Sequence, residues 1–234
     1  MNASKSATLI RQDRWYVEDA LAPGELDQLS SWSTSATKRA VDVCIVAVSL
    51  PIVLPIMLFI AIAIRISSRG PALFFQQRIG RDGRPFIIWK FRTMTTAVAD
   101  HAIAALHSRR VTAVGRFLRR SKLDELPQIV NVLLGDMSLV GPRPLIADQQ
   151  LRIFSCRPGM TGAATLAFVR EEALLAAIPK AEVALYYRRV VLPRKHQVDA
   201  DYMSNATFAS DLGIIVRSML WCWLSPGRIP PLKH

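Results

Sequence analysis

The longest apolar segment of the chain is CIVAVSLPIVLPIMLFIAIAI, residues 44–64, which contains no charged side chain. As a helix rising about 1.5 Å per residue, it could cross a hydrocarbon core of about 30 Å, so a single spanning helix is one interpretation. Pro51 and Pro55 indicate another, because each removes a backbone donor and clashes with the preceding turn. We therefore expect a helix that enters the membrane, bends at the prolines and returns.

Basic residues stand on both sides of this apolar segment, whereas an excess of positive charge normally marks only its cytoplasmic side. They are Lys38, Arg39, Arg65, Arg69 and Arg78. Two basic flanks fit a re-entrant helix, residues 38–66, with both ends at the cytoplasmic face. Asp42 lies at the entry to the segment, where a carboxylate is costly in lipid. We expect Asp42 to stay at the interface or to pair with Arg39 or Lys38.

Beyond the apolar segment, two short runs have the composition of strands. Phe74–Ile79 and Arg84–Phe91 are rich in β-branched and aromatic residues, and Gly-Arg-Asp-Gly separates them at residues 80–83. Asp-Gly is a strong turn signal, so the two runs predict a β-hairpin at the membrane surface. Residues 95–110 contain several alanines and two histidines and are expected to be helical.

A further helix is expected to begin near Ser121. The Ser121 hydroxyl would cap it, and Asp124 and Glu125 would lie in its first turn, where acidic side chains suit the helix dipole. Pro127 is tolerated only near the start of such a helix. Gly135 is expected to end it.

Two further elements complete the pattern. The sequence MSLVGPRP at residues 137–144 predicts a strand and a rigid turn, and Asp211–Leu224 predicts an apolar helix with tryptophans in the membrane interface. Together the elements predict a membrane-associated α+β protein, in which a re-entrant N-terminal helix precedes a small cytosolic domain of helices, a β-hairpin and interfacial amphipathic helices. We divide the chain into an extension, the membrane helix, the main domain and a tail, at residues 1–37, 38–66, 67–224 and 225–234.

Charge is unevenly distributed over the 234 residues. Residues 1–37 carry three basic and five acidic side chains and show little apolar periodicity, so we expect a flexible extension with a short helix near Trp15–Asp19. The whole chain has a net charge of +12, which indicates an anionic partner such as nucleic acid, a phosphorylated substrate or lipid head groups. Hydrophobic residues make up 51% and the mean hydropathy is +0.23, which argues against a disordered chain and favours a membrane protein.

Several common kinds of site have no support in the sequence. The three cysteines, Cys44, Cys156 and Cys222, are far apart and form no CxxC pair, so neither a disulfide scaffold nor a zinc ribbon is expected. The four histidines form no HExxH pattern. No GxxxxGK[ST] loop occurs, which disfavours phosphoryl transfer from ATP.

The adjacent carboxylates of Asp124 and Glu125 carry the most informative chemistry. Neighbouring helical residues point about 100° apart, so the two would take different roles. One would attack as a nucleophile, and the other would bind a hard cation such as Mg²⁺ together with substrate phosphate. Basic side chains that could neutralise phosphate oxygens are Lys90, Arg92, Arg116, Arg119, Arg120, Lys122 and Arg143. Taken alone, the two acids are better explained as offsetting a helix dipole, and any single base could at least as well face anionic lipid.

The chain resembles the bacterial sugar transferases, that is, the monotopic polyprenol-phosphate phosphoglycosyl transferases. The matching pieces are KRAVD, the proline-containing apolar segment, GPALFFQQRIGRDGRPFIIWKFRTM, VGRFLRRSKLDELPQIVNVLLGDMSLVGPRP, RPGMTG and, near the C-terminus, DYM and DLGII. The first five follow one another almost without a gap over residues 38–162. After PGMTG many members read WAQVNGR, where this chain reads AATLAFVREE, so that this part resembles only a subgroup.

The resemblance implies that residues 67–224 form a catalytic domain on the cytoplasmic face of a bacterial inner membrane. It would transfer a sugar 1-phosphate from a UDP-sugar to undecaprenyl phosphate and release UMP, the first membrane step of exopolysaccharide, O-antigen, capsule or glycoprotein glycan assembly. Asp124 would attack the β-phosphate and form a covalent aspartyl-phosphosugar, and Glu125 would bind Mg²⁺. The substrate-binding positions would be Lys90, Arg119, Pro142, Arg143 and Pro144.

Two alternatives stay open on the sequence alone. One is a membrane-attached basic protein without catalytic activity that binds anionic lipid or nucleic acid, although such a protein gains nothing from carboxylates inside its basic stretch. The other is a family member that acts only as a scaffold. The expected partners are a UDP-sugar, polyprenol phosphate and inner-membrane lipid, without nucleic acid. A homodimer is compatible with the sequence. The sequence does not indicate which UDP-sugar is used.

Overall fold

The computed structural model describes residues 29–95, 111–146, 149, 153–169, 171–179 and 181–223. The described α-helices are α3 (Ser31–Thr34), α4 (Ala36–Ser67), α5 (Ala113–Ser121), α6 (Ile129–Leu134), α7 (Ala163–Ala167), α8 (Glu171–Ala176), α9 (Val183–Tyr186), α10 (Leu192–Asn205) and α11 (Phe208–Trp223). The 3₁₀ helices η1 (Arg81–Gly83) and η3 (Leu123–Gln128) and the π-helix η5 (Tyr187–Val191) join them. The strands are β1 (Leu73–Ile79), β2 (Pro85–Phe91), β3 (Ser138–Val140) and β4 (Gly159–Thr161). The helices expected at Trp15–Asp19 and, but for one residue, at 95–110 lie outside the described residues, as does the tail 225–234.

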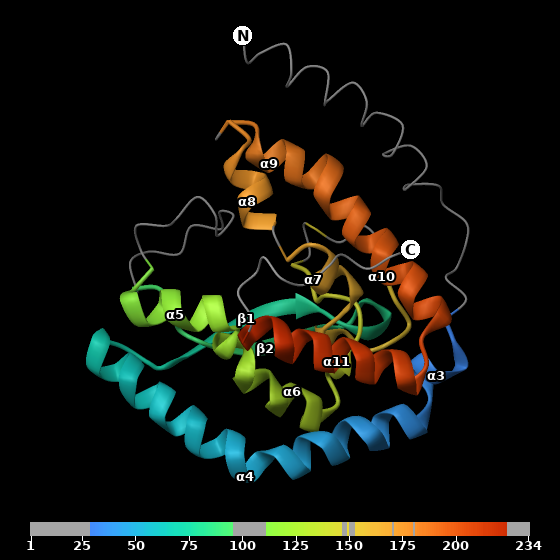
Figure 1. Cartoon of the computed structure of the whole chain (residues 1–234), viewed down its shortest axis with the longest axis horizontal. Helices are drawn as coiled ribbons and strands as arrows, with labels where there is room; N and C mark the ends of the chain where they lie inside the picture. Colours follow the sequence, from blue (N-terminus) through green and yellow to red (C-terminus); the bar gives the residue numbers. More distant parts are fainter. Residues whose placement is uncertain are drawn as a thin grey trace.

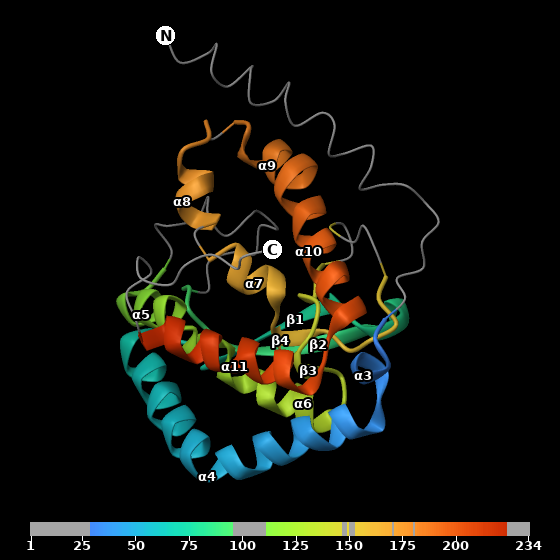
Figure 2. The same ribbon diagram turned by 45° about the vertical axis from the view of Figure 1, so that its right-hand side comes forward.

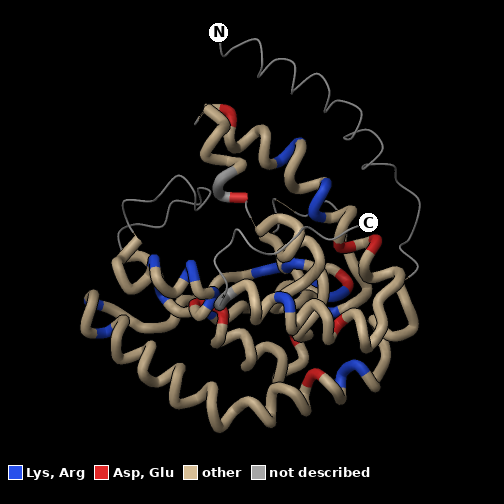
Figure 3. Tube along the Cα trace, viewed as in Figure 1, with Lys and Arg blue, Asp and Glu red and all other residues tan. Residues whose placement is uncertain are grey.

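The apolar segment forms the long helix α4, which continues through Pro51 and Pro55. It bends beneath the rest of the molecule, so that its two ends rise toward the same folded unit (Figures 1 and 2). Its middle carries no charge (Figure 3) and exposes large apolar side chains such as Val48 and Phe59, which are 80% and 72% accessible. Within the described residues, α4 is the one helix long and apolar enough to cross a membrane.

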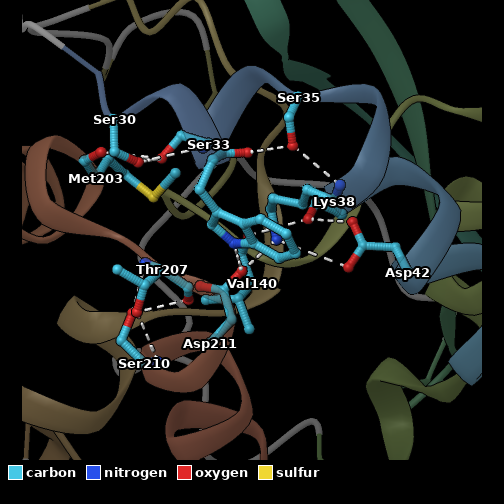
Figure 4. A network of polar contacts seen from close by, with 12 residues as sticks. Ser30, Ser33, Ser35, Lys38, Asp42, Val140, Met203, Thr207, Ser210 and Asp211 are labelled. Carbon is cyan, nitrogen blue, oxygen red and sulfur yellow. Dashed lines mark hydrogen bonds and ion pairs between the residues drawn. The ribbon is translucent and has the colours of Figure 1, made fainter.

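A buried ionic network holds the N-terminal end of α4 (Figure 4). Lys38 Nζ lies 2.6 Å from Asp211 Oδ2 on α11 and 3.7 Å from Asp42 Oδ1, one turn further along α4. Trp32 Nε1 donates to the same Asp211 oxygen at 2.8 Å, and Ser138 Oγ on β3 donates to Asp42 Oδ2 at 2.6 Å. The expected pairing of Asp42 with Lys38 is confirmed.

Residues 30–37, which the sequence patterns assigned to the extension, are folded here. Ser30 caps α3 by accepting a hydrogen bond from Ser33 N at 3.2 Å, and Ser33 Oγ donates to Met203 O on α10 at 2.9 Å. Ser35 then caps α4 by accepting from the backbone N–H of Lys38. The docking partner comes from the distant α10, so local composition does not encode this contact.

The C-terminal end of α4 is held by the hairpin and by α5. Arg92, which follows β2, donates to the backbone oxygen of Arg69 at 2.8 Å. Ile64 is buried against Phe91 of β2 and Leu118 of α5. Both ends of α4 therefore contact one folded unit.

The predicted β-hairpin is confirmed. Strands β1 and β2 pair antiparallel, with Gln76 opposite Ile88. Asp82 and Gly83 take left-handed conformations in the connecting turn, with φ of 55° and 76°. Asp and Gly are among the few residues that accept such angles at little cost, so the local sequence determines the turn.

The expectation that Ser121 caps a helix is wrong. Ser121 is the last residue of α5, which Thr112 caps, and the Ser121 hydroxyl donates back to a backbone oxygen of the preceding turn at 2.9 Å. Lys122 then adopts a left-handed conformation with φ 58°, and the chain continues as η3 before α6 begins. Gly135 ends α6 with φ 94°, as predicted. The two carboxylates consequently lie in a 3₁₀ turn between helices.

The strand predicted in MSLVGPRP is β3, which pairs in parallel with β4. The predicted C-terminal apolar helix is α11, which begins at Phe208. Val140 of β3, Ala163 of α7 and Ile214 of α11 are buried together, so this core joins the short parallel sheet to the C-terminal helices. The described chain is thus a mixed α+β unit that lies on one side of a long apolar helix (Figure 1).

Candidate active site

The carboxylate pair lies in η3, which rests on strand β2. Asn131 of α6 is fully buried and bonds to the main chain of β2 at two points. Its Oδ1 accepts from Trp89 N at 3.1 Å, and its Nδ2 donates to Ile87 O at 2.7 Å. This clamp fixes the segment that carries the carboxylates relative to Lys90, the next residue of β2.

Glu125 forms the centre of a charged cluster. Lys90 Nζ lies 2.7 Å from Glu125 Oε1, and a terminal guanidinium nitrogen of Arg143 lies 3.9 Å from the same oxygen. Burial raises the pKa of Glu125, but the charges of Lys90, Arg143 and Lys122 together outweigh burial and lower the pKa from 4.5 to about 2. Glu125 is therefore anionic at neutral pH.

Asp124 has a different environment. Its Oδ1 atom is buried and has no hydrogen-bond partner among the described residues. Burial and the adjacent charge of Glu125 raise the pKa of Asp124, while Lys90, Lys122 and Arg119 act in the opposite direction. An unsatisfied buried acceptor is costly, and a catalytic role is one reason for which it persists.

A glycine brings Arg119 close to the pair. Thr112 N donates to Thr93 O at 3.1 Å, and a Cβ on Gly115 would lie only 2.0 Å from that oxygen. Only glycine allows α5 to approach the segment after β2 so closely. With α5 packed this closely, Arg119 Nε donates to Thr93 Oγ1 at 2.9 Å, and the positive charge of Arg119 lowers the pKa of Asp124.

The Pro-Arg-Pro turn enters the site from the end of β3. Pro142 and Pro144 are buried, whereas Arg143 is partly exposed. Pro142 O accepts from Gly159 N at 2.9 Å, and Arg143 N donates to Asp199 Oδ2 at 3.1 Å. The turn is thus held by one bond to the backbone of Gly159 and one to the side chain of Asp199, and it directs one guanidinium toward Glu125.

The structure brings together four predicted site residues from three separate segments: Lys90, Asp124, Glu125 and Arg143. Arg119 and the two prolines frame this cluster, and the chemical roles of all these residues stay predictions. Sequence reasoning missed Asn131 and Asp199. A polar residue inside the apolar stretch IVNVLL could have indicated Asn131, but no local signal marks Asp199.

Glu125 is the predicted Mg²⁺ ligand. Throughout the described ranges, no three or more His, Cys, Asp or Glu side chains gather in one place. Mg²⁺ is usually held by one or two carboxylates together with substrate phosphates and water, and the pair with its unpartnered Asp124 oxygen fits that arrangement. Lys90 already bonds to Glu125 Oε1, so a cation would share this carboxylate with it.

Comparison with known proteins gives consistent matches. A family model described as "Bacterial sugar transferase" matches residues 33–224. The UDP-glucose:undecaprenyl-phosphate glucose-1-phosphate transferase of Caulobacter vibrioides is 37% identical over 195 residues, 78% of this chain and 68% of that protein. The Escherichia coli protein of the same name is 44% identical over 138 residues, 53% of this chain. The undecaprenyl-phosphate galactose phosphotransferase of Salmonella typhimurium is 37% identical over 160 residues, 58% of this chain. The chain spans only 30% of the E. coli protein and 33% of the Salmonella protein.

Proposed function

Because the chain belongs to the bacterial sugar transferase family, we propose that it is a phosphoglycosyl transferase, which moves a sugar 1-phosphate from a UDP-sugar to undecaprenyl phosphate and releases UMP. The observation that carries this proposal is the cluster of Asp124 and Glu125 with Lys90 and Arg143, because phosphoryl transfer needs a nucleophile beside fixed positive charge. The names of the relatives include glucose, galactose and N-acetylgalactosamine, so a UDP-hexose or a UDP-N-acetylhexosamine is the proposed donor class. A non-catalytic basic binding protein is not favoured.

The reaction would proceed in two displacements at one phosphorus. An oxygen of ionised Asp124 attacks the β-phosphorus of the UDP-sugar, and the bond from that phosphorus to UMP breaks with its electron pair on UMP. An oxygen of polyprenol phosphate then attacks the same phosphorus, and the Asp124 carboxylate leaves. Lys90 and Arg143 supply positive charge next to the reacting phosphates, which stabilises the charge that develops there.

We also propose that Glu125 binds Mg²⁺ in the presence of substrate. The cation would offset phosphate charge that otherwise repels an attacking carboxylate. Its remaining ligands would be phosphate oxygens and water, as is usual for Mg²⁺. The low pKa of Glu125, about 2, supports this role because the side chain is fully ionised at neutral pH.

The proposed setting is the cytoplasmic face of a bacterial inner membrane, with α4 re-entrant. A spanning helix would place its two ends on opposite sides of the bilayer, whereas the first turn of α4 and its C-cap residue Ser68 both bond to one folded unit. Exposed apolar side chains on α5, α6 and α11 are suited to contact lipid at the interface: Phe117, Leu133, Leu134, Val216, Met219 and Leu220. Exposed Arg116 and Arg120 on α5 would then meet anionic head groups.

Cysteine labelling tests this topology at two exposed positions, one in the first turn of α4 and one just after its last residue. Thr37→Cys and Arg69→Cys, made separately in a cysteine-free background, should both resist an impermeant maleimide in intact cells and react after lysis. Labelling of one position from outside would replace the re-entrant helix with a spanning one. Replacing Pro51 and Pro55 by Ala removes a penalty of about 3 kcal/mol per proline from a straight helix, and should shift α4 toward the spanning form.

Release of UMP from a panel of UDP-hexoses and UDP-N-acetylhexosamines tests the chemistry. Asp124→Asn keeps the side-chain shape but loses the attacking charge, so UMP release should fall to background. Glu125→Gln should be partly rescued by raised Mg²⁺. The exposed Asp201→Asn and Glu182→Gln are matched controls that should keep wild-type rates.

The covalent step has its own readout. Protein mixed with UDP-hexose but no polyprenol phosphate should gain the mass of a phosphohexose on Asp124, and Asp124→Asn should not. Normal turnover by Asp124→Asn would defeat the covalent mechanism, and no UMP release by the wild-type protein from any donor of the panel would defeat the proposed activity.

A further inference from the structure

Asp199 of α10 joins two backbone segments next to the charged cluster. Its Oδ2 accepts from Arg143 N at 3.1 Å, and its Oδ1 accepts from Ala164 N at 3.0 Å, in the first turn of α7. The residue is 5% exposed, so both carboxylate oxygens are used inside the protein. Both bonds end on main-chain groups, and one of these groups belongs to a residue of the proposed active site.

Three glycines hold these segments in direct backbone contact. A Cβ on Gly141 would lie 2.5 Å from Arg157 O, and a Cβ on Gly162 would lie 2.3 Å from Gly141 O. Gly159 is equally tight, because its Cβ would lie 2.2 Å from Gly141 N. Asp199 bonds through its side chain to two of these closely packed segments, at Arg143 N and at Ala164 N. A small shift of the Asp199 side chain would therefore be passed on to the Pro-Arg-Pro turn.

The carboxylate is expensive to keep at this position. Burial raises the pKa of Asp199 from 3.8 to about 6, although the two N–H groups and the charges of Arg143 and Lys195 lower it. The folded state therefore binds a proton on the Asp199 carboxylate more tightly than the unfolded state does. Above about pH 6 the ionised carboxylate lowers the stability of the fold, and that stability is regained as the pH falls from about 6 toward 3.8. A group that costs stability at neutral pH needs a reason other than stability.

Arg143 supplies that reason. Its guanidinium lies 3.9 Å from Glu125 Oε1, and the negative charges of Glu125 and Asp124 both raise the pKa of Arg143. We propose that Asp199 is a positioning residue for phosphosugar transfer, which bonds to the main chain of Arg143 and thereby holds its guanidinium beside the carboxylate pair. The inference rests on the proposed function, since it assigns Arg143 a place at the donor phosphates.

A double-mutant cycle tests the proposal through single-turnover UMP release from UDP-hexose. Asp199→Asn leaves one of the two N–H groups without an acceptor and should slow release about 10- to 100-fold, the scale expected for a misplaced active-site group. In an Arg143→Ala background the same change should cost less than about 2-fold, because no guanidinium remains to be positioned. UDP affinity, which needs no turnover, should follow the same pattern. Asp201→Asn, an exposed carboxylate on the same helix, is the matched control and should alter neither measurement.

The outcomes separate the two proposals. Equal fold-losses from Asp199→Asn in both backgrounds would overturn the positioning role, while wild-type UMP release would leave the proposed activity intact. No release by the wild-type protein from any donor would overturn the activity itself. If Asp199→Asn fails to fold, Asp199→Ser, which keeps a single acceptor, is put through the same cycle. Failure of both variants to fold would assign Asp199 to the fold alone and overturn the proposal.

Discussion

Replacing Lys38 by Met should destabilise the protein through the network at the start of α4. Lys38, Asp42 and Asp211 are 5%, 4% and 5% exposed, so the one cation lies between two buried carboxylates (Figure 4). Met has similar length and no charge. The substitution therefore removes the ammonium with little change in packing and leaves both carboxylates without their counter-charge.

The expected loss in the free energy of unfolding depends on the hydrogen bonds that each carboxylate keeps in the variant. Removing one partner of a buried ion pair costs about 3–5 kcal/mol, because the other charge stays uncompensated. Asp211 still accepts hydrogen bonds from Trp32 at 2.8 Å and Tyr202 at 2.7 Å, and Asp42 keeps one at 2.6 Å, so the lower end applies. A loss of about 3 kcal/mol corresponds to a fall of about 10 °C in the unfolding midpoint for a chain of this size.

Thermal unfolding in detergent at pH 7, followed by tryptophan fluorescence, measures this change. Adding Asp211→Asn to Lys38→Met removes one uncompensated charge and should recover part of the loss. Arg65→Met, at an exposed position on the same helix, is the control and should change the free energy of unfolding by less than about 0.5 kcal/mol. The reasoning would be refuted if Lys38→Met unfolds within 2 °C of the wild type, or if the double variant is no more stable than the single.

Two further substitutions test the site. Gly115→Ala should push α5 away from the backbone oxygen of Thr93, 2.0 Å from the new Cβ, and lower both the unfolding midpoint and activity, whereas Gly213→Ala, with nothing within 4 Å, should lower neither. The pKa of Glu125 is lowered from 4.5 to about 2, so its ionised form contributes stability above pH 4.5 that is lost as pH falls toward 2. Lys90→Met should remove most of that contribution and raise the pH of acid unfolding; an unchanged acid transition would contradict the assignment.

Local signals in the sequence were sufficient for several elements. The Asp82-Gly83 turn and the end of α6 at Gly135 follow from backbone angles that few residues accept. The long apolar helix follows from composition alone. Each of these features depends on atoms within a few residues of one another, and local sequence patterns can therefore predict them.

The tertiary structure decided what those signals could not. Ser121 has the chemistry of a helix cap, yet it ends α5, because the left-handed turn at Lys122 lets η3 lie against β2. Lys90 meets Glu125 across 35 residues of sequence, and Asp199 reaches Arg143 across 56. Charges and hydrogen bonds act through space at a few ångströms, so such partners are determined only once the topology has brought distant segments together.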